Sequence, residues 1–297
     1  MIVITAPTGN IGRHLLSRLL EAAPAAGEEL RVIVREPARL PDAARGRVEV
    51  ITGSHADAEV LDLAFEGADA VFWLVPPDAT LTPQDAYSGF TRPAAKALVA
   101  HGVTHVVGVS ALGRGTPLAD RAGLVTASLA MDDLIADTGV AYRALANPSF
   151  FENLLEEAVS IREKGVFTDS LDADRKAPFV AAADIAAAAA GLLLDRSWTG
   201  TGSVPVLGPQ DLSPDDLARV MTEQLGRPVR YERQPLDELY TTLIGHGLNE
   251  AFVQGMVDMK RAKDEGLDAG LARTSDTTSP TTFEQWCART LKPAVLS

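Results

Sequence analysis

The chain has 297 residues, of which 46% are hydrophobic and 23% are charged. These proportions exclude extensive disorder, and the length suits one large α/β domain with a smaller appendage better than many small modules. A formal net charge of −13 disfavours nucleic acid as a partner, because a phosphate backbone would be repelled.

We expect a soluble, cytoplasmic protein that does not enter a membrane. Met1–Thr5 is too short to be a hydrophobic leader before the first strand. The longest apolar stretch, Phe179–Leu194, is mostly alanine and contains Asp184, so we interpret it as a packed helix. The single cysteine, Cys287, excludes an internal disulfide and a thiolate zinc site, and we interpret it as a bystander in a polar segment.

Short apolar runs alternate with helical patterns in the first half of the chain. The expected strands are Ile2–Thr5, Leu30–Arg35, Val48–Thr52, Asp69–Val75, His105–Ser110 and Val140–Leu145. The expected helices are one starting near Ile11, followed by Ala58–Phe65, Pro93–His101 and Leu124–Thr138. Continuous apolar strands that alternate with helices predict an α/β fold with a doubly wound parallel sheet.

The alternation decays beyond Pro148. Helices are expected at Phe150–Lys164, Ala181–Leu194 and Ser213–Leu225, with a short strand at Val204–Leu207 and a mostly helical segment over Leu236–Leu291. We therefore expect residues 1–148 to form a nucleotide-binding domain onto which residues 178–207 pack back. Residues 149–177 and 208–297 are expected to form a lobe that shapes the substrate pocket.

The turn between the first strand and the first helix has the features of a dinucleotide loop. Gly9 lets the backbone approach a pyrophosphate, and Gly12 lets the helix pack closely. Two glycines three residues apart would also suit helix packing alone, but their place at the first strand–helix turn favours nucleotide binding. Since Pro7 donates no N–H, anion contacts should begin near Asn10 and Ile11. The cofactor-binding residues expected here are Thr5, Pro7, Thr8, Gly9, Asn10, Ile11 and Gly12.

Two arginines follow the second strand and favour NADP(H) over NAD(H). An acidic residue at this place would grip the ribose diol of NAD. Arg35 occupies it instead, with Arg39 one turn later, and a guanidinium pairs well with a 2′-phosphate. An exposed arginine at a strand end, beside Glu36, is the simpler alternative.

Several segments together resemble the NmrA-like group of atypical short-chain dehydrogenases. They are TAPTGNIG, VIVREPARL, GADAVFWLVPP, GVTHVVGVSALG, TGVAYRALANPSFFENLL, FVAAADIAAAA and LSPDDLARVMTEQLGRPVRY. The resemblance covers nearly the whole chain. It implies a Rossmann sheet with a smaller, mainly helical C-terminal lobe. Such proteins include NADPH-dependent quinone and dye reductases, as well as NADP-sensing regulators without known catalysis.

The chain departs from the family pattern at four positions. Ala6 replaces the first loop glycine, and Asn147 replaces the arginine before the proline of the sixth strand. Ser128 stands where the family often has a lysine, and Leu124 where the wider superfamily has a catalytic tyrosine. No Tyr-x-x-x-Lys occurs in the sequence, so the pair that would protonate a carbonyl oxygen is absent. This disfavours interconversion of alcohols and ketones.

Hydride transfer to a quinone-like or conjugated acceptor needs no protein acid, because charge spreads over the acceptor. Ligands of this fold bind beyond the carboxyl ends of the strands, so the loops after the fourth, fifth and sixth strands should line the pocket. We expect Ser110 and Asn147 to be catalytic, although Ser110 could equally satisfy local backbone. The cofactor residues expected here are Val75, Pro76, Ser110, Asn147, Pro148 and Phe150. Phe150 and Phe151 suit a pocket wall or a core.

The sequence thus predicts an NADPH-dependent reductase of a small-molecule acceptor. An NADP(H)-binding redox sensor without turnover and a non-redox enzyme on the same fold remain as alternatives. A hydrolase is disfavoured, because Gly108–Leu112 ends in leucine where a nucleophile elbow has glycine, and only His246 follows in the right order. The five histidines lack ligand spacing, so no metal is expected. The oligomeric state is open, a homodimer included.

Overall fold

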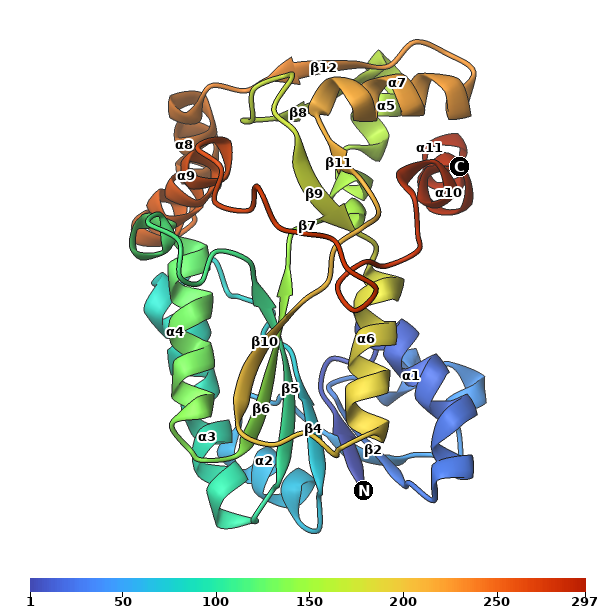
Figure 1. The fold of residues 1–297 in the computed structure, drawn as a ribbon, viewed down its shortest axis with the longest axis vertical. Coiled ribbons are helices and arrows are strands. Elements are labelled where there is room, and N and C mark those ends of the chain that lie inside the picture. Colours follow the sequence, from blue (N-terminus) through green and yellow to red (C-terminus); the bar gives the residue numbers. More distant parts are fainter.

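A seven-stranded parallel sheet forms the lower half of the computed structural model, which describes residues 1–297 (Figure 1). Its strands are β1 (Ile2–Ile4), β2 (Leu30–Val34), β3 (Glu49–Thr52), β4 (Ala70–Trp73), β5 (His105–Ala111), β6 (Ala141–Asn147) and β10 (Thr201–Pro205). The strand order is β10-β6-β5-β4-β1-β2-β3, and every pair is parallel. The predicted doubly wound sheet is therefore confirmed, with the seventh strand starting three residues earlier than expected.

Helices cover both faces of this sheet. One face carries α1 (Gly12–Ala22) and α6 (Ala182–Leu194), and the other carries α2 (Ala58–Phe65), α3 (Phe90–Ala100) and α4 (Leu124–Ala136) (Figure 1). The alanine-rich face of α6 is buried against α1 and the strands, because small side chains allow close approach. The stretch Phe179–Leu194 thus includes a packed helix, and none of the helices combines the length and apolar character needed to cross a membrane.

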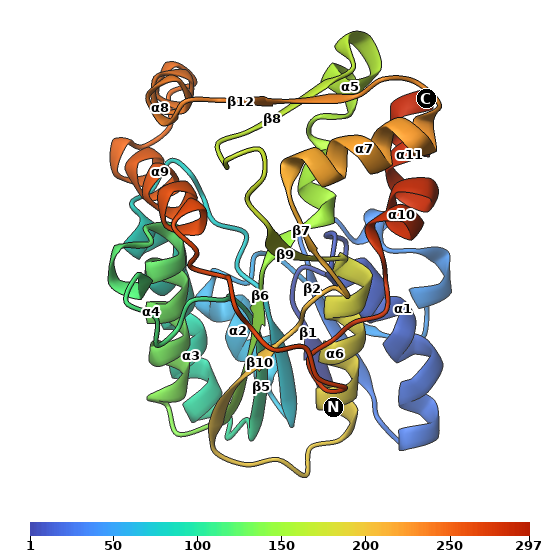
Figure 2. The same ribbon diagram turned by 45° about the horizontal axis from the view of Figure 1, so that its top comes forward.

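The upper half is a lobe of short strands and helices (Figures 1 and 2). Its strands are β7 (Ser149–Phe150), β8 (Val166–Asp169), β9 (Ala177–Val180), β11 (Asp211–Leu212) and β12 (Arg230–Arg233). Its helices are α5 (Ala158–Lys164), α7 (Pro214–Leu225), α8 (Leu236–Gly245), α9 (Glu250–Asp264), α10 (Phe283–Trp286) and α11 (Lys292–Leu296). Two small sheets, β11-β9-β7 and β12-β8, were not expected from the sequence.

The prediction of one helix over Phe150–Lys164 is wrong. Phe150 pairs with Val180 in the strand pair β7–β9, and a 3-10 helix (Phe151–Leu155) precedes α5. Burial explains the break: Phe151 is turned into an aromatic cluster with Phe179, Phe283 and Trp286, which a continuous helix would not reach. The segment Leu236–Leu291 is also less helical than predicted, since residues 265–282 contain no helix.

Cys287 lies in the same apolar cluster and not in a polar segment, which corrects its interpretation. Its side chain is fully buried, and burial raises the pKa of the thiol to about 11. Glu152 ties this cluster to the lower half, because it accepts hydrogen bonds from the Ala182 amide at 2.9 Å and from Trp286 Nε1 at 3.0 Å. We propose that the boundary between the nucleotide-binding domain and the upper lobe lies at residue 148, and that β9 belongs to the upper lobe.

Candidate functional site

In the loop between β1 and α1, the backbone of Gly12 lies very close to the carbonyl group of Ala6. Ala6 adopts a left-handed backbone (φ +48°), which is the conformation that glycine supplies most easily. A Cβ on Gly12 would lie 2.0 Å from the Ala6 carbonyl oxygen, so only glycine fits there. At Gly9 the same construction gives an ordinary 3.4 Å contact. Gly12 therefore lets the start of α1 pack against the loop carbonyl.

The first amides of α1 are free for an anion. The N–H groups of Asn10, Ile11 and Gly12 donate to no acceptor in the protein, and Gly9 and Asn10 are exposed. Other predicted loop residues shape the turn: Thr5 joins β1 to β4 through bonds with Phe72 O (2.9 Å) and the Leu74 amide (3.0 Å). Pro7 and the Ile11 side chain are buried beneath the loop, and Thr8 is half-buried.

Arg35 and Arg39 lie beyond the carboxyl end of β2, beside the loop that follows β1. Both side chains are exposed. Arg39 forms a weak ion pair with Glu36 at 3.9 Å, whereas Arg35 has no carboxylate within ion-pair distance. Arg35 is thus a guanidinium without a partner at the edge where a dinucleotide would place its adenosine end.

A cavity of about 320 Å³ opens beyond the carboxyl ends of β4, β5 and β6, where α9 of the upper lobe closes it. The residues that line it are Val75, Pro77, Tyr87, Val109, Ser110, Ala111, Leu124, Val125, Ser128, Asn147, Pro148, Ser149, Phe150, Asn153, Met259, Lys260 and Lys263. The structure thereby brings together the predicted residues Val75, Ser110, Asn147, Pro148 and Phe150. Pro76 does not line the cavity, and Pro77 lines it instead.

Asn147 presents an acceptor that no protein group satisfies. Its Nδ2 donates to Leu145 O at 2.7 Å and to Ser110 O at 3.1 Å, which fixes the orientation of the amide. Its Oδ1 is buried without a hydrogen-bond partner. Because an orphaned buried acceptor is costly, this atom fits an incoming donor such as the carboxamide N–H₂ of a nicotinamide.

Ser110 is held by a buried network that the sequence did not reveal. Its Oγ donates to Asp132 Oδ2 at 2.5 Å, and Tyr142 Oη donates to Asp132 Oδ1 at 2.6 Å. Burial raises the pKa of Asp132 to about 6. The sequence did contain a signal for this buried carboxyl. Asp132 falls on the apolar face of α4, four residues after Ser128 and eight after Leu124.

The cavity also receives side chains from segments without a motif. Tyr87 comes from a π-helical turn (Asp85–Gly89), and burial raises its pKa to about 12, so it stays a phenol. Lys260 Nζ pairs with Asp169 Oδ1 at 2.7 Å, whereas Lys263 Nζ pairs with Asp268 Oδ2 at 2.6 Å. Both lysines come from α9, so no pattern near the strands could have indicated them.

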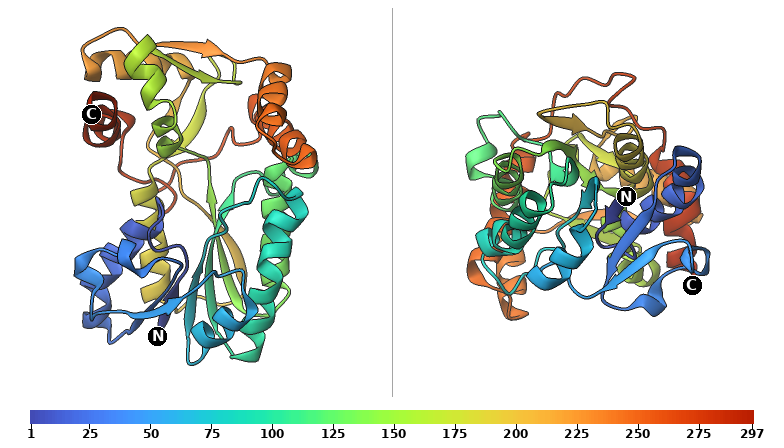
Figure 3. Two further views of the ribbon diagram at one scale, coloured as in Figure 1. Left: turned by 180° about the vertical axis from the view of Figure 1, so that it is seen from behind. Right: turned by 90° about the horizontal axis from the view of Figure 1, so that it is seen from below.

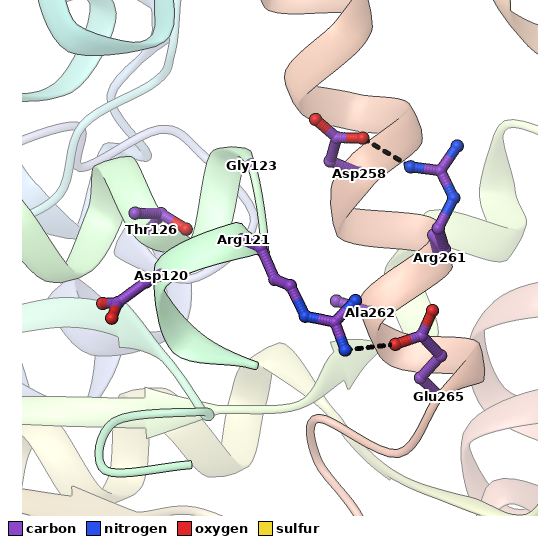
Figure 4. A pocket seen from close by; sticks show the side chains of 8 residues that line it. All are labelled: Asp120, Arg121, Gly123, Thr126, Asp258, Arg261, Ala262 and Glu265. Atoms are coloured by element: carbon purple, nitrogen blue, oxygen red, sulfur yellow. Dashed lines mark hydrogen bonds and ion pairs between the residues drawn. The ribbon is translucent and has the colours of Figure 1, made fainter. Parts of the chain in front are cut away.

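A polar groove of about 350 Å³ marks the seam between α4 and α9 (Figure 4). Its arginines are already paired, Arg121 with Glu265 at 2.8 Å and Arg261 with Asp258 at 2.6 Å. At the start of α4 a Cβ on Gly123 would lie 1.9 Å from the carbonyl oxygen of Gly255 on α9. The groove therefore joins the two halves beside the cavity, and the views from behind and from below show α9 next to α4 (Figure 3).

The hydrolase alternative finds no support in this geometry. Ser110 is bonded to a carboxyl group and not to a histidine. His246 lies exposed at the end of α8 and is not among the residues around the cavity.

Two family models match the chain. A model described as NAD(P)H-binding matches residues 7–196, and the model of the NmrA-like family matches residues 139–287. The chain belongs to the NmrA-like family of NAD(P)H-binding proteins. This confirms the resemblance predicted from the sequence motifs.

Several relatives of the chain are named as reductases or oxidoreductases. It is 33% identical over 262 residues to a (4-alkanoyl-5-oxo-2,5-dihydrofuran-3-yl)methyl phosphate reductase of Streptomyces griseus subsp. griseus, covering 86% of this chain and 85% of that one. It is 28% identical to an NAD(P)H azoreductase of Xenophilus azovorans, covering 92% and 91%. The solved NADPH complex of a quinone oxidoreductase of Escherichia coli has a TM-score of 0.77 and 26% identity, covering 100% and 99%. These matches confirm the predicted NAD(P)H-dependent oxidoreductase.

Proposed function

We propose that this protein reduces small conjugated acceptors of the quinone or enone class with NADPH as the hydride donor. The orphaned Oδ1 of Asn147 carries this proposal, because Asn147 lines a cavity at the strand ends where a nicotinamide ring belongs in this fold. The phosphate loop supplies the other end, with free amides at Asn10, Ile11 and Gly12. When bound, the reduced nicotinamide supplies hydride, and the protein supplies orientation and shelter from water.

The preference for NADPH over NADH rests on Arg35. An exposed guanidinium without a carboxylate partner can pair with a 2′-phosphate, and it would gain nothing from the diol of NADH. The E. coli quinone oxidoreductase, which was solved with NADPH, supports the same preference.

The acceptor class follows from the walls of the cavity. Leu124 and Ser128 face it from α4, so the positions where the superfamily has its tyrosine and lysine supply no such pair here. Both lysine charges are balanced by Asp169 and Asp268, which favours an uncharged acceptor over one that carries a phosphate. A cavity of 320 Å³ lies near the lower end of the roughly 300–1,000 Å³ typical of ligand pockets, so we expect small acceptors.

The test is stopped-flow loss of NADPH absorbance with a panel of acceptors. Neutral quinones, enones and azo dyes should oxidise NADPH in the presence of the protein. Saturated ketones and aldehydes are the matched controls and should give no turnover, since charge cannot spread over them. A sulfonated or phosphorylated quinone tests the expected preference for neutral acceptors. Saturable NADPH binding with no oxidation by any member of the panel would instead support the redox-sensing alternative.

A further inference from the structure

A buried carboxyl group lies directly behind the cavity, and hydride transfer as described above does not use it. Asp132 is 2% exposed, and its two oxygens accept from Ser110 and Tyr142. A Cβ on Gly108 would lie 2.3 Å from Tyr142 Oη, so a glycine at this place on β5 is what lets the tyrosine reach the carboxyl. Burying a carboxyl group is costly. This cost favours a role of Asp132 beyond joining α4 to Ser110 on β5 and Tyr142 on β6.

Asp132 connects the cavity with the surface. On one side its partner Ser110 lines the cavity at the end of β5. On the other side Asp132 itself lines a second hollow of about 150 Å³ between α4 and β10. The rim of that hollow is exposed at Asp133 and at 201–202. A line of hydrogen-bonding groups therefore runs from solvent through Asp132 and Ser110 to the cavity.

We propose that Asp132 and Ser110 form a proton relay that delivers the proton of the reduction to the acceptor oxygen. This inference rests on the proposed function and deepens it. It assigns Ser110 as the group that touches the acceptor and Asp132 as a positioning and proton-supplying residue behind it. The relay supplies its proton to a conjugated acceptor and reaches solvent even when the cavity is filled.

The proton balance is simple. A reduced nicotinamide dinucleotide provides the hydride, and one proton from solvent completes the reduction. The Ser110 O–H bond breaks as its proton passes to the acceptor oxygen, and the proton on Asp132 Oδ2 moves to Ser110 Oγ. Water in the surface hollow then returns a proton to Asp132. With Asp132 ionised, the serine proton is held by the carboxylate, so the relay works only with the neutral acid.

The groups around Asp132 set its pKa, and so the pH range in which it is the neutral acid. Desolvation is the main cause of its raised pKa, while the hydrogen bonds from Ser110 and Tyr142 and the Arg114 charge lower it. Arg114 lies 3.6 Å from Asp132 and 2.8 Å from Asp133, whose own charge raises the pKa of Asp132. The charged and titratable groups on the cavity side are those of Tyr87, Lys260 and Lys263.

The first test is the pH dependence of kcat with a quinone that the wild type reduces, measured from about pH 5 to about pH 8.5. Wild-type kcat should fall as the pH rises through the pKa of Asp132. Asp132→Asn and Ser110→Ala should lower kcat about 100-fold at the acid end and lose this pH dependence. Arg114→Met removes a charge that lowers the pKa of Asp132, so the fall should move to higher pH while the plateau is kept.

A second readout does not depend on turnover. The infrared carbonyl band of a protonated carboxyl, followed against pH in the NADP⁺ complex, should titrate near the pKa of Asp132 in the wild type. This band should be missing from Asp132→Asn and should titrate at higher pH in Arg114→Met. Thermal unfolding of each variant would check that it is folded.

Several outcomes would overturn the relay. One is an Asp132→Asn variant that keeps the wild-type kcat and the wild-type pH profile. Another is a Tyr87→Phe variant that loses the pH-dependent fall in kcat while Asp132→Asn retains it. A wild type that turns over no acceptor would remove the proposed function and the relay with it. Turnover without the expected pH profile would remove the relay alone, so the two failures are distinguishable.

Discussion

The two ends of the proposed cofactor site are built in different ways. The phosphate end is local, because β1, its loop and α1 lie within Ile2–Ala22 and Arg35 follows the neighbouring strand. The acceptor end draws its wall from six separate segments between Val75 and Lys263. One end is a single strand–helix unit, and the other exists only once the whole chain has folded.

This difference explains why sequence motifs indicate the phosphate end more reliably than the acceptor end. A local unit repeats in many proteins because the backbone itself binds the ligand, so few side chains are free to vary. An acceptor pocket is bound by side chains, which can differ from one relative to the next. The reductases of Streptomyces griseus and Xenophilus azovorans match most of this chain, yet their names specify different acceptors.

The sharpest test of the local end is Gly12→Ala. A Cβ placed 2.0 Å from Ala6 O would force the loop and helix start apart, so the amides would no longer converge on a pyrophosphate. We expect NADPH to bind at least about 100-fold more weakly, equivalent to about 2.8 kcal/mol. Isothermal calorimetry measures this loss.

Gly191→Ala is the matched control for that change. Gly191 lies on the exposed face of α6, and a Cβ there would meet nothing within 4 Å. The substitution should leave NADPH binding intact and stabilise the helix by up to about 1 kcal/mol. If Gly12→Ala bound NADPH as tightly as this control does, the loop would not be the phosphate site.

Arg35→Ala tests the second part of the local end. Losing one charge-assisted pair with a 2′-phosphate should weaken NADPH binding roughly 10- to 100-fold and leave NADH nearly unchanged. Arg39→Ala should have a smaller effect, because that side chain already lies near Glu36. Arg45→Ala, which removes an exposed arginine paired with Asp42, serves as control. Equal losses for both cofactors in Arg35→Ala would exclude a phosphate contact.

The sequence predicted the sheet and the phosphate loop because both follow from local patterns. It also placed Ser110 and Asn147 at the pocket, since the ends of parallel strands meet at one edge. It missed the upper lobe's small sheets, because pairs such as Phe150 with Val180 join segments thirty residues apart without a turn signal. Lys263 was beyond reach, since only the docking of α9 brings it to the cavity.

That docking can be broken at Gly123. Gly123→Ala would place a Cβ 1.9 Å from Gly255 O, so α9 must shift and carry Lys260 and Lys263 with it. We expect KM for the acceptor to rise roughly tenfold, because small misplacements at a site are costly. The dissociation constant for NADPH should stay close to that of the wild type. Should this variant fail to fold, Gly255→Ala, whose nearest contacts are 3.1 Å and 3.2 Å, gives a milder form of the same shift.

The last expected effect is on stability, and it comes from the acceptor end alone. Burial raises the pKa of Asp132 from 3.8 to about 6, so the folded chain holds this proton more tightly than the unfolded chain does. Folding stability from this group is therefore present at low pH and is lost as the pH rises from about 4 to about 6. At about 1.4 kcal/mol for each pKa unit, the loss is on the order of 3 kcal/mol or less.

Asp132→Asn carries no such proton. Its unfolding temperature relative to the wild type should rise by a few degrees across that pH window and then level off. The comparison is made as a difference between the two proteins, so that the other titrating groups cancel. Parallel unfolding curves over the whole window would mean that folding does not raise the pKa of this carboxyl. An Asp132 with its ordinary pKa of 3.8 would be ionised near neutral pH and could not hold the proton that the acceptor end requires, whereas the phosphate end would be unaffected.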